Sequence, residues 1–261
     1  MEHEIIFVTF HTTDRTWENS AHPYGGNKSP HTELLPYFIA SIRSSCRSAR
    51  IVLLTDEHSQ ADPGFDTVIR TEVRPEKLML ERAYAQLAYL AGCEEGQHIV
   101  LIDTDTIVVR DVSDVFAIEF DVAVTIRDSP QYDFEKRMPY NNGIVYLRNT
   151  QSTQDYLRSV IECNEEMEEE LHAWSGNQFA VLSLLGRQEP YEVVRIGSAK
   201  VLILPCDPYN YTPDTTSERI HEKFILHFRG NAKRNMIPTA LILGLGNSVI
   251  KSGLPENANE Q

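Results

Sequence analysis

The sequence is short of cationic side chains. Lys and Arg together number 24, against 38 Asp and Glu, so the formal net charge of the 261 residues is −14. A negative field of this size disfavours nucleic acid and anionic membrane surfaces, and we expect neither as a partner. A phosphorylated ligand remains compatible with this charge if a metal ion or a few local cations hold its phosphates.

Cysteine and long apolar runs are also scarce. The cysteines are four scattered residues without CxxC spacing, which indicates reduced, structural thiols. They are Cys46, Cys93, Cys163 and Cys206. No apolar run approaches the roughly 18 residues of a membrane-spanning helix, and the acidic start Met1–Glu4 does not resemble a signal peptide. We therefore expect a cytoplasmic protein without a transmembrane segment.

Buried strands and amphipathic helices alternate along the first hundred residues. Apolar runs at 5–8, 51–56 and 99–102 indicate strands, and helical spacing of apolar residues at 34–42 and 75–90 indicates helices. This order predicts an α/β fold with a parallel sheet covered by helices. Further strands are expected near 68–69, 121–125, 143–148, 193–194, 201–204 and 224–227, and further helices near 152–172 and 178–185.

Three polar segments carry weaker expectations. The connection from His11 to Ser29 is unusually long, and we expect a lid there. The glutamate-rich run 165–170 is expected to be a solvated helix face. The polar stretch 255–261 is expected to be frayed.

Two carboxylates follow the apolar strand at 99–102. Asp103 and Asp105 are separated by Thr104. Residues i and i+2 of an extended chain point to the same face, so the two carboxylates should project together at the carboxyl end of the strand, where open α/β sheets bind ligands. Such a pair favours Mg²⁺ or Mn²⁺. The simpler alternative is that the aspartates only end a strand and begin a turn.

An apolar strand ending in Asp-x-Asp also resembles the haloacid-dehalogenase-type phosphatases, in which the first aspartate is a nucleophile. That motif continues with Thr or Val two residues after the second aspartate, where this chain has Ile107. It also usually lies near the N-terminus, whereas about a hundred residues precede it here.

Three further segments accompany the aspartates in a fixed order. They are Asn141–Gly143 before an apolar strand, Gly176–Gln178 at a helix start, and His227–Lys233 after the late strand. In this order and spacing, the chain resembles the metal-dependent glycosyltransferases of the GT-A fold over about residues 4–235. The most similar group is family eight, which contains glycogenin and bacterial lipopolysaccharide galactosyltransferases.

The resemblance implies one GT-A domain over residues 1–261, with a mixed central sheet flanked by helices. Its nucleotide-binding half is expected at about 1–105 and its acceptor half at about 106–250. The implied activity is that of a hexosyltransferase, which moves a sugar from a nucleotide-diphosphate sugar, usually UDP-linked, to the hydroxyl of a carbohydrate or other acceptor.

The resemblance also assigns residues to the donor site. The expected metal ligands, for Mn²⁺ or Mg²⁺, are Asp103, Asp105 and His227. The expected contacts to the nucleotide sugar are Thr9, Phe10, His11, Arg82, Thr104, Asn141, Gly230 and Lys233. A departing nucleoside diphosphate develops negative charge, which a metal and a lysine stabilise.

One position departs from the family. Family-eight members commonly carry Asp before the donor-site glutamine, where this chain has Asn177. An amide cannot act as a carboxylate nucleophile. We therefore expect Asn177 and Gln178 to act in catalysis through front-face attack with retention, Gln178 stabilising the oxocarbenium-like carbon. If the enzyme inverts instead, it needs a base, and the loose candidates are Asp133, Glu135 and Asp207.

The sequence predicts the acceptor site less completely than the donor site. Trp174 either stacks on a sugar ring or packs under its helix, and residues 207–211 either line the acceptor site or form a turn packed by tyrosines. Two other functions also remain. A nucleotidyltransferase usually has a glycine-rich basic loop after the first strand, which residues 10–15 lack. A non-catalytic module would bind a nucleotide sugar without releasing UDP.

Overall fold

A mixed sheet forms the centre of the molecule. The computed structural model describes residues 4–13, 32–128, 133–213, 218–246 and 249. Within them an eight-stranded sheet has the order β3-β2-β1-β4-β7-β6-β9-β8, and a separate two-stranded sheet pairs β10 with β5. The strands are β1 (Ile5–Phe10), β2 (Arg50–Thr55), β3 (Thr67–Arg70), β4 (His98–Ile102), β5 (Thr106–Val108), β6 (Val122–Ile126), β7 (Tyr140–Arg148), β8 (Val193–Ile196), β9 (Ala199–Pro205) and β10 (Ile225–His227).

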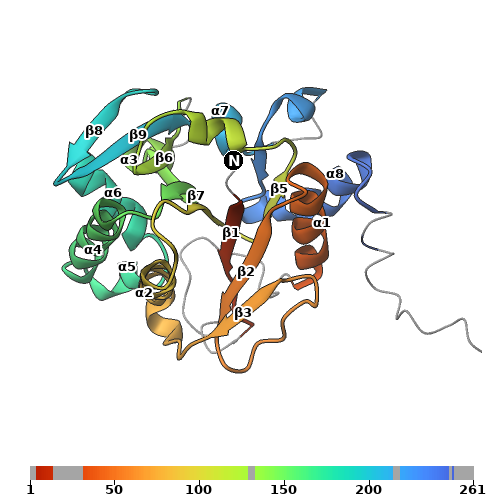
Figure 1. Cartoon of the computed structure of the whole chain (residues 1–261), viewed down its shortest axis with the longest axis horizontal. Helices are drawn as coiled ribbons and strands as arrows, with labels where there is room; N and C mark the ends of the chain where they lie inside the picture. The colour runs from red at the N-terminus through yellow and green to blue at the C-terminus, as the bar shows by residue number, and fades with distance from the viewer. Residues whose placement is uncertain (1–3, 14–31, 129–132, 214–217, 247–248, 250–261) are drawn as a thin grey trace, which may run out of the picture.

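Helices cover both faces of the large sheet (Figure 1). The α-helices are α1 (Leu35–Ser45), α2 (Leu78–Ala91), α3 (Asp133–Arg137), α4 (Gln151–Glu165), α5 (Glu169–His172), α6 (Gly176–Leu185), α7 (Cys206–Tyr209) and α8 (Met236–Ile242). In Figure 1, α1 and α8 lie on one side of the sheet, and α2, α4, α5 and α6 lie together on the other.

The first half of the sheet is parallel, as the sequence predicts. β2 and β4 both pair parallel with β1, and β3 pairs parallel with β2. Alternate residues of each strand enter different cores: Phe7 packs on the α1 side, and Ile6 and Val8 pack on the side of α2, α4 and α6. Burial on both faces explains why these strands appear in the sequence as continuous apolar runs.

The second half of the sheet makes it mixed. β7 runs antiparallel to both β4 and β6, whereas β6 and β9 are parallel. β7 therefore inserts beside β4 and places the segment 141–143 next to the carboxyl end of that strand, where Asp103 N–H donates to the Gly143 carbonyl at 2.8 Å. The expected mixed sheet flanked by helices is confirmed.

The single helix expected over 152–172 is wrong, because the chain breaks between α4 and α5. Glu168 has an extended backbone (φ −57°, ψ 139°) and precedes α5. At the break, the His172 ring contacts the carbonyl of Asn164 at 2.9 Å, a carbonyl that also accepts the Met167 N–H at 3.1 Å. The glutamates of 165–170 are exposed, as expected, but they flank this break and do not form one helix face.

Two expectations lie outside the described residues. They are most of the expected lid, residues 14–29, and the expected frayed end, residues 255–261. Among the described residues, none of the helices combines the length and apolar character needed to cross a membrane.

Candidate donor and metal site

The two aspartates of the Asp-x-Asp motif lie in a turn. Asp103 follows β4, residues 104 and 105 form the turn, and the Thr106 hydroxyl donates to the Asp103 carbonyl at 2.7 Å. The expected reason for their convergence, an extended chain, is therefore wrong. The carboxylates face the same region because the backbone reverses between β4 and β5. Thr104 itself is half-buried in this turn.

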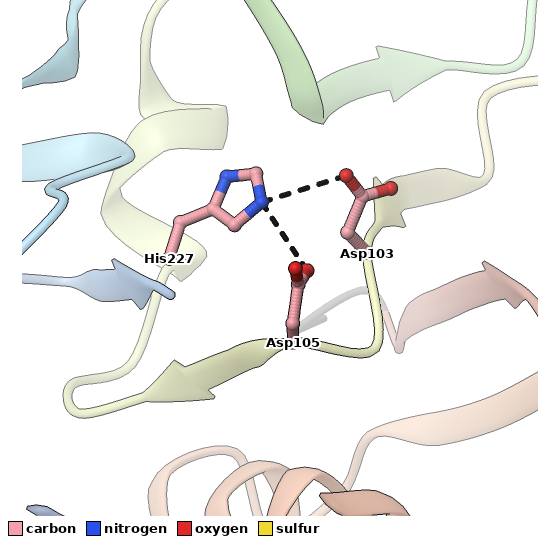
Figure 2. A group of neighbouring side chains, drawn as sticks. All are labelled: Asp103, Asp105 and His227. Carbon is pink, nitrogen blue, oxygen red and sulfur yellow. Dashed lines mark ion pairs between the residues drawn. The ribbon is translucent and has the colours of Figure 1, made fainter. Parts of the chain in front are cut away.

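The short strand β5 brings the third candidate ligand to the aspartates. β5 pairs antiparallel with β10 in a register that sets Thr106 opposite His227. The His227 Nε2 lies 3.2 Å from an Asp105 oxygen and 3.5 Å from an Asp103 oxygen (Figure 2). One ligand atom from each residue falls within 4.8 Å of the others. Two carboxylates and an imidazole are a donor set that suits Mn²⁺.

Gly143 is required for this close approach. A Cβ atom built on Gly143 would lie 2.1 Å from His227 Cε1 and 2.9 Å from an Asp103 carboxylate oxygen. Any side chain here would displace the imidazole or the carboxylate. The glycine of the Asn-x-Gly motif thus has a steric role beneath the candidate ligands.

Asn210 fixes the orientation of the His227 ring. Its Nδ2 donates to the Thr125 hydroxyl at 2.7 Å and to the Asn141 carbonyl at 3.0 Å, so its Oδ1 must be the atom 2.9 Å from His227 Nδ1. An amide oxygen only accepts, so Nδ1 carries a proton and Nε2 is the ring nitrogen that faces the two aspartates. A partner of this kind on the far nitrogen is the usual way to orient a metal-binding histidine.

Lys233 lies against the buried Asp105. Its Nζ is 3.1 Å from an Asp105 oxygen, and the charge of that carboxylate raises the pKa of Lys233. Burial raises the pKa of Asp105, but the Lys233 and His227 side chains outweigh it, so this pKa lies well below its usual range. Asp105 is therefore ionised at neutral pH and ready to bind a cation.

Arg82 connects Asp103 to the start of helix α6. Its Nη1 lies 2.5 Å from an Asp103 oxygen, and its Nη2 donates to the Asn142 carbonyl at 3.3 Å. Asn142 in turn donates from Nδ2 to the Asn177 carbonyl at 3.0 Å. The structure thus joins four separate segments, α2, the turn after β4, β7 and α6, in one polar network.

Gln178 faces a buried cluster of charges. Its Oε1 lies 3.5 Å from Nη2 of Arg127, whose Nε is 3.7 Å from Glu135. Arg229 shares the same Glu135 oxygen at 3.0 Å. Burial and the charge of Arg229 lower the pKa of Arg127 to about 10, so it is still a cation at neutral pH. One carboxylate therefore lies between two guanidinium groups beside Gln178.

The remaining expected donor contacts lie at two places. Asn141 is buried, and its Oδ1 accepts the Gly143 N–H at 3.3 Å. Gly230 begins the short helix Gly230–Asn235 with φ +53°, a left-handed conformation that suits glycine, and a Cβ there would point into open space. Open space at Gly230, three residues before Lys233, leaves room for a ligand near the Lys233 segment.

The end of β1 adjoins the end of β4. Val8 pairs with Leu101, so Phe10 and Asp103 lie two residues further along the two parallel strands. Thr9 and His11 are buried and Phe10 is half-buried. The three expected base contacts thus lie at the carboxyl end of β1, next to β4, which leads into the aspartates.

A carboxylate after β2 holds the loop after β1. The buried Asp56 accepts the backbone N–H groups of His58 and Ser59 at 2.7 and 2.8 Å, and Ser59 Oγ accepts the Thr13 N–H at 2.6 Å. Burial raises the pKa of Asp56, but hydrogen bonds from Ser59, Thr12 and the backbone outweigh it and lower the pKa to about 2.

We expect Asp56→Asn to be less stable than the native chain by about 2 kcal/mol at pH 7. A carboxyl group whose pKa is lower in the folded than in the unfolded state stabilises the fold at pH values above its unfolded pKa, which is near 4. This contribution is lost as the pH falls towards the folded-state pKa of about 2. The free energy of unfolding, measured with urea between pH 7 and pH 3, should therefore become more similar for Asp56→Asn and the native chain as the pH falls. The exposed Glu57→Gln serves as control and should change stability by less than about 0.5 kcal/mol. A gap that is the same at pH 7 and pH 3 would contradict the assignment.

The weaker acceptor-side candidates are mostly engaged in packing or ion pairs. Trp174 is 47% exposed, so part of the residue is accessible to a ligand. In the loop 207–211, the Tyr209 ring stacks on Phe224 with 5.1 Å between centroids, which agrees with a turn packed by tyrosines. Of the loose base candidates, Asp133 pairs with Lys136, Asp207 with Lys223, and Glu135 with two arginines.

Comparison with known proteins supports a transferase. The chain matches the family model for nucleotide-diphospho-sugar transferases over residues 40–235. No curated protein sequence matches it significantly. The solved structures it resembles include a glycosyltransferase involved in glycosylation of the major capsid of PBCV-1. The identity is 11% and the TM-score 0.55, with 92% of this chain and 99% of that chain covered.

Two further structures have the same fold. The galactosyltransferase LgtC, solved with donor and acceptor sugar analogues, is 12% identical with a TM-score of 0.54, and 96% of this chain and 98% of that chain are covered. The glycosyltransferase GlyE of Streptococcus pneumoniae TIGR4 is 14% identical with a TM-score of 0.55, covering 98% of this chain and 66% of that chain. At these identities the likeness establishes the fold, and the family model establishes the family. The chain belongs to the nucleotide-diphospho-sugar transferase family and is a glycosyltransferase with the GT-A fold.

Proposed function

We propose that the protein transfers a sugar from a UDP-sugar to an acceptor hydroxyl, with Mn²⁺ or Mg²⁺ held by Asp103, Asp105 and His227. The observation that carries the proposal is the approach of these three ligand atoms to within 4.8 Å, beside Lys233. The donor set fits a hard divalent ion. A metal bound there supplies positive charge to the departing diphosphate.

The surrounding residues divide the remaining tasks. Lys233 provides a second positive charge for the leaving group, and Gly230 leaves space beside it. Arg82 and Asn141 hold the donor sugar, and Thr9, Phe10 and His11 hold the base at the end of β1. Thr104 contributes to the donor site from the turn between the aspartates. Asn210 keeps His227 Nε2 directed at the metal position.

We further propose that the anomeric configuration is retained. Asn177 offers an amide where a covalent mechanism needs a carboxylate, so the acceptor would attack from the face that the diphosphate leaves. Gln178 then stabilises the positive anomeric carbon, while Arg127 holds its amide in place. Glu135 is ion-paired with two arginines and Asp207 with Lys223, which lowers their basicity and favours this path over inversion through either of them as base.

The test is release of UDP from UDP-sugars, with and without Mn²⁺ and after chelation. We expect slow hydrolysis of at least one donor that depends on the metal, and an NMR spectrum that shows the first-formed sugar with the donor's anomeric configuration. Binding of UDP and Mn²⁺ without any UDP release from a panel of UDP-hexoses would instead identify a binding module.

A further inference from the structure

A small cavity lies between the sheet and the helices α2, α4 and α6. Its volume is about 40 Å³. Most of its wall is apolar, formed by Ala83, Leu101, Val124, Val145, Tyr156, Leu157, Val160, Ile161 and Val181. The remaining wall is polar and consists of Arg82, Gln86, Asn142 and Asn177. The cavity lining therefore combines apolar side chains with buried polar ones.

Several lining residues carry hydrogen-bonding atoms without partners. Among the described residues, nothing pairs with five side-chain atoms of the lining: Arg82 Nε, Gln86 Nε2, Asn142 Oδ1, Asn177 Oδ1 and the Tyr156 hydroxyl. Arg82, Gln86 and Asn142 are each at most 8% exposed. Buried polar groups are nearly always paired, so two donors, two acceptors and a hydroxyl around one cavity indicate a missing polar group.

The network described above fixes how these atoms point. Arg82 directs Nη1 to Asp103 and Nη2 to the Asn142 carbonyl, and its Nε is left without a partner. Asn142 donates from Nδ2 to the Asn177 carbonyl, and its Oδ1 is the atom without a partner. The cavity thus shares Arg82 with the candidate metal ligand Asp103 and shares Asn177 with the candidate catalytic pair.

The size and chemistry of the cavity favour one substituent. Each water needs about 10–15 Å³, so the cavity holds about three or four non-hydrogen atoms. A sugar hydroxyl has one such atom and would leave most of the polar groups unpaired. An acetamido group has four: its carbonyl could accept from Arg82 Nε and Gln86 Nε2, its N–H could donate to an asparagine oxygen, and its methyl would meet the apolar lining.

We propose that the donor is a 2-acetamido sugar whose acetamido group occupies this cavity. The inference rests on the proposed function, because it places the donor sugar beside Arg82, Asn142 and Asn177. A site built to pair a polar group rejects a donor that lacks it, since its own buried groups then stay unpaired.

Calorimetric titration with Mn²⁺ present tests the proposal. The probes are UDP, UDP-N-acetylglucosamine and UDP-N-acetylgalactosamine, with UDP-glucose and UDP-galactose as their 2-hydroxy counterparts. We expect at least one acetamido donor to bind at least tenfold more tightly than its counterpart. Equal affinities within each pair would overturn the proposal and would assign the cavity to ordered water.

A cavity-filling variant adds a second measurement. Ala83 is half-buried on the cavity wall, so Ala83→Leu should reduce the acetamido preference to near unity. The matched control Ala88→Leu changes an exposed position of the same helix and should keep the native preference. An undiminished preference in folded Ala83→Leu would overturn the proposal, and if this variant does not fold, the native titration decides. Failure of UDP itself to bind with Mn²⁺ would refute the proposed function instead.

Discussion

Replacing Asp105 with asparagine should lower metal-dependent UDP release by about a thousandfold or more while leaving the fold intact. Asp105 is the candidate ligand that contacts both His227 and Lys233, and it is buried. The amide has one coordinating oxygen in place of two and no charge, so both the metal affinity and the electrostatic support for the leaving group fall. The measurement is donor hydrolysis over a range of Mn²⁺ concentrations.

The control for this variant is Asp114→Asn, which removes the same charge from an exposed position. It should hydrolyse the donor at the native rate. Circular dichroism should give native spectra for both variants. Native activity in Asp105→Asn would exclude a metal role for this carboxylate. It would favour the alternative that the two aspartates only end a strand and begin a turn.

Gly143→Ala should abolish metal binding without removing any candidate ligand. The added methyl group would lie 2.1 Å from His227 Cε1 and 2.6 Å from His227 Nδ1, distances that no real contact allows. The imidazole must therefore rotate away from Asn210 and from the two aspartates. We expect the affinity for Mn²⁺, measured by titration calorimetry, to fall at least about a hundredfold.

Gly92→Ala is the matched control. A Cβ there would lie 3.6 Å from the Tyr89 carbonyl, an ordinary contact, so metal binding should not change. Thermal unfolding shows whether Gly143→Ala remains folded. A folded Gly143→Ala protein with native Mn²⁺ affinity would show that His227 is not a ligand in the position described.

The sequence predicts the elements that have strong local signals. β1, β2 and β4 are continuous apolar runs because both faces of the sheet are covered, and their order with α1 and α2 is enough to predict the parallel half. The Asp-x-Asp motif predicts a divalent-metal site from its own chemistry. The role of His227 is predicted only from a resemblance to known transferases, because nothing local links it to Asp103.

What the sequence could not provide is the long-range pairing. β5 has three residues directly after the aspartates, and only its pairing with β10 brings His227 to them. The sequence predicts an acceptor loop or a packed turn at 207–211, whereas Asn210 in this segment orients the His227 ring. The break before α5 has no local signal, because the His172 contact beside it joins residues eight apart in an otherwise helical pattern.

The cavity behind the donor site had no sequence signal at all. Its polar wall combines Arg82 and Gln86 from α2 with Asn142 from β7 and Asn177 from α6. Each of these residues alone resembles an ordinary polar side chain. Only their arrangement in three dimensions reveals that their free atoms converge on one space.

The most direct test of the central claim is the thermal shift of the native protein with UDP, GDP, CDP and ADP, each with and without Mn²⁺. A ligand at about a hundred times its dissociation constant stabilises by about 2.7 kcal/mol, which raises the melting temperature by roughly 5 °C or more for a chain of this size. We predict this rise for UDP only when Mn²⁺ is present. The absence of any rise, with every nucleotide at millimolar concentration, would contradict a metal-dependent nucleotide-sugar site at Asp103, Asp105 and His227.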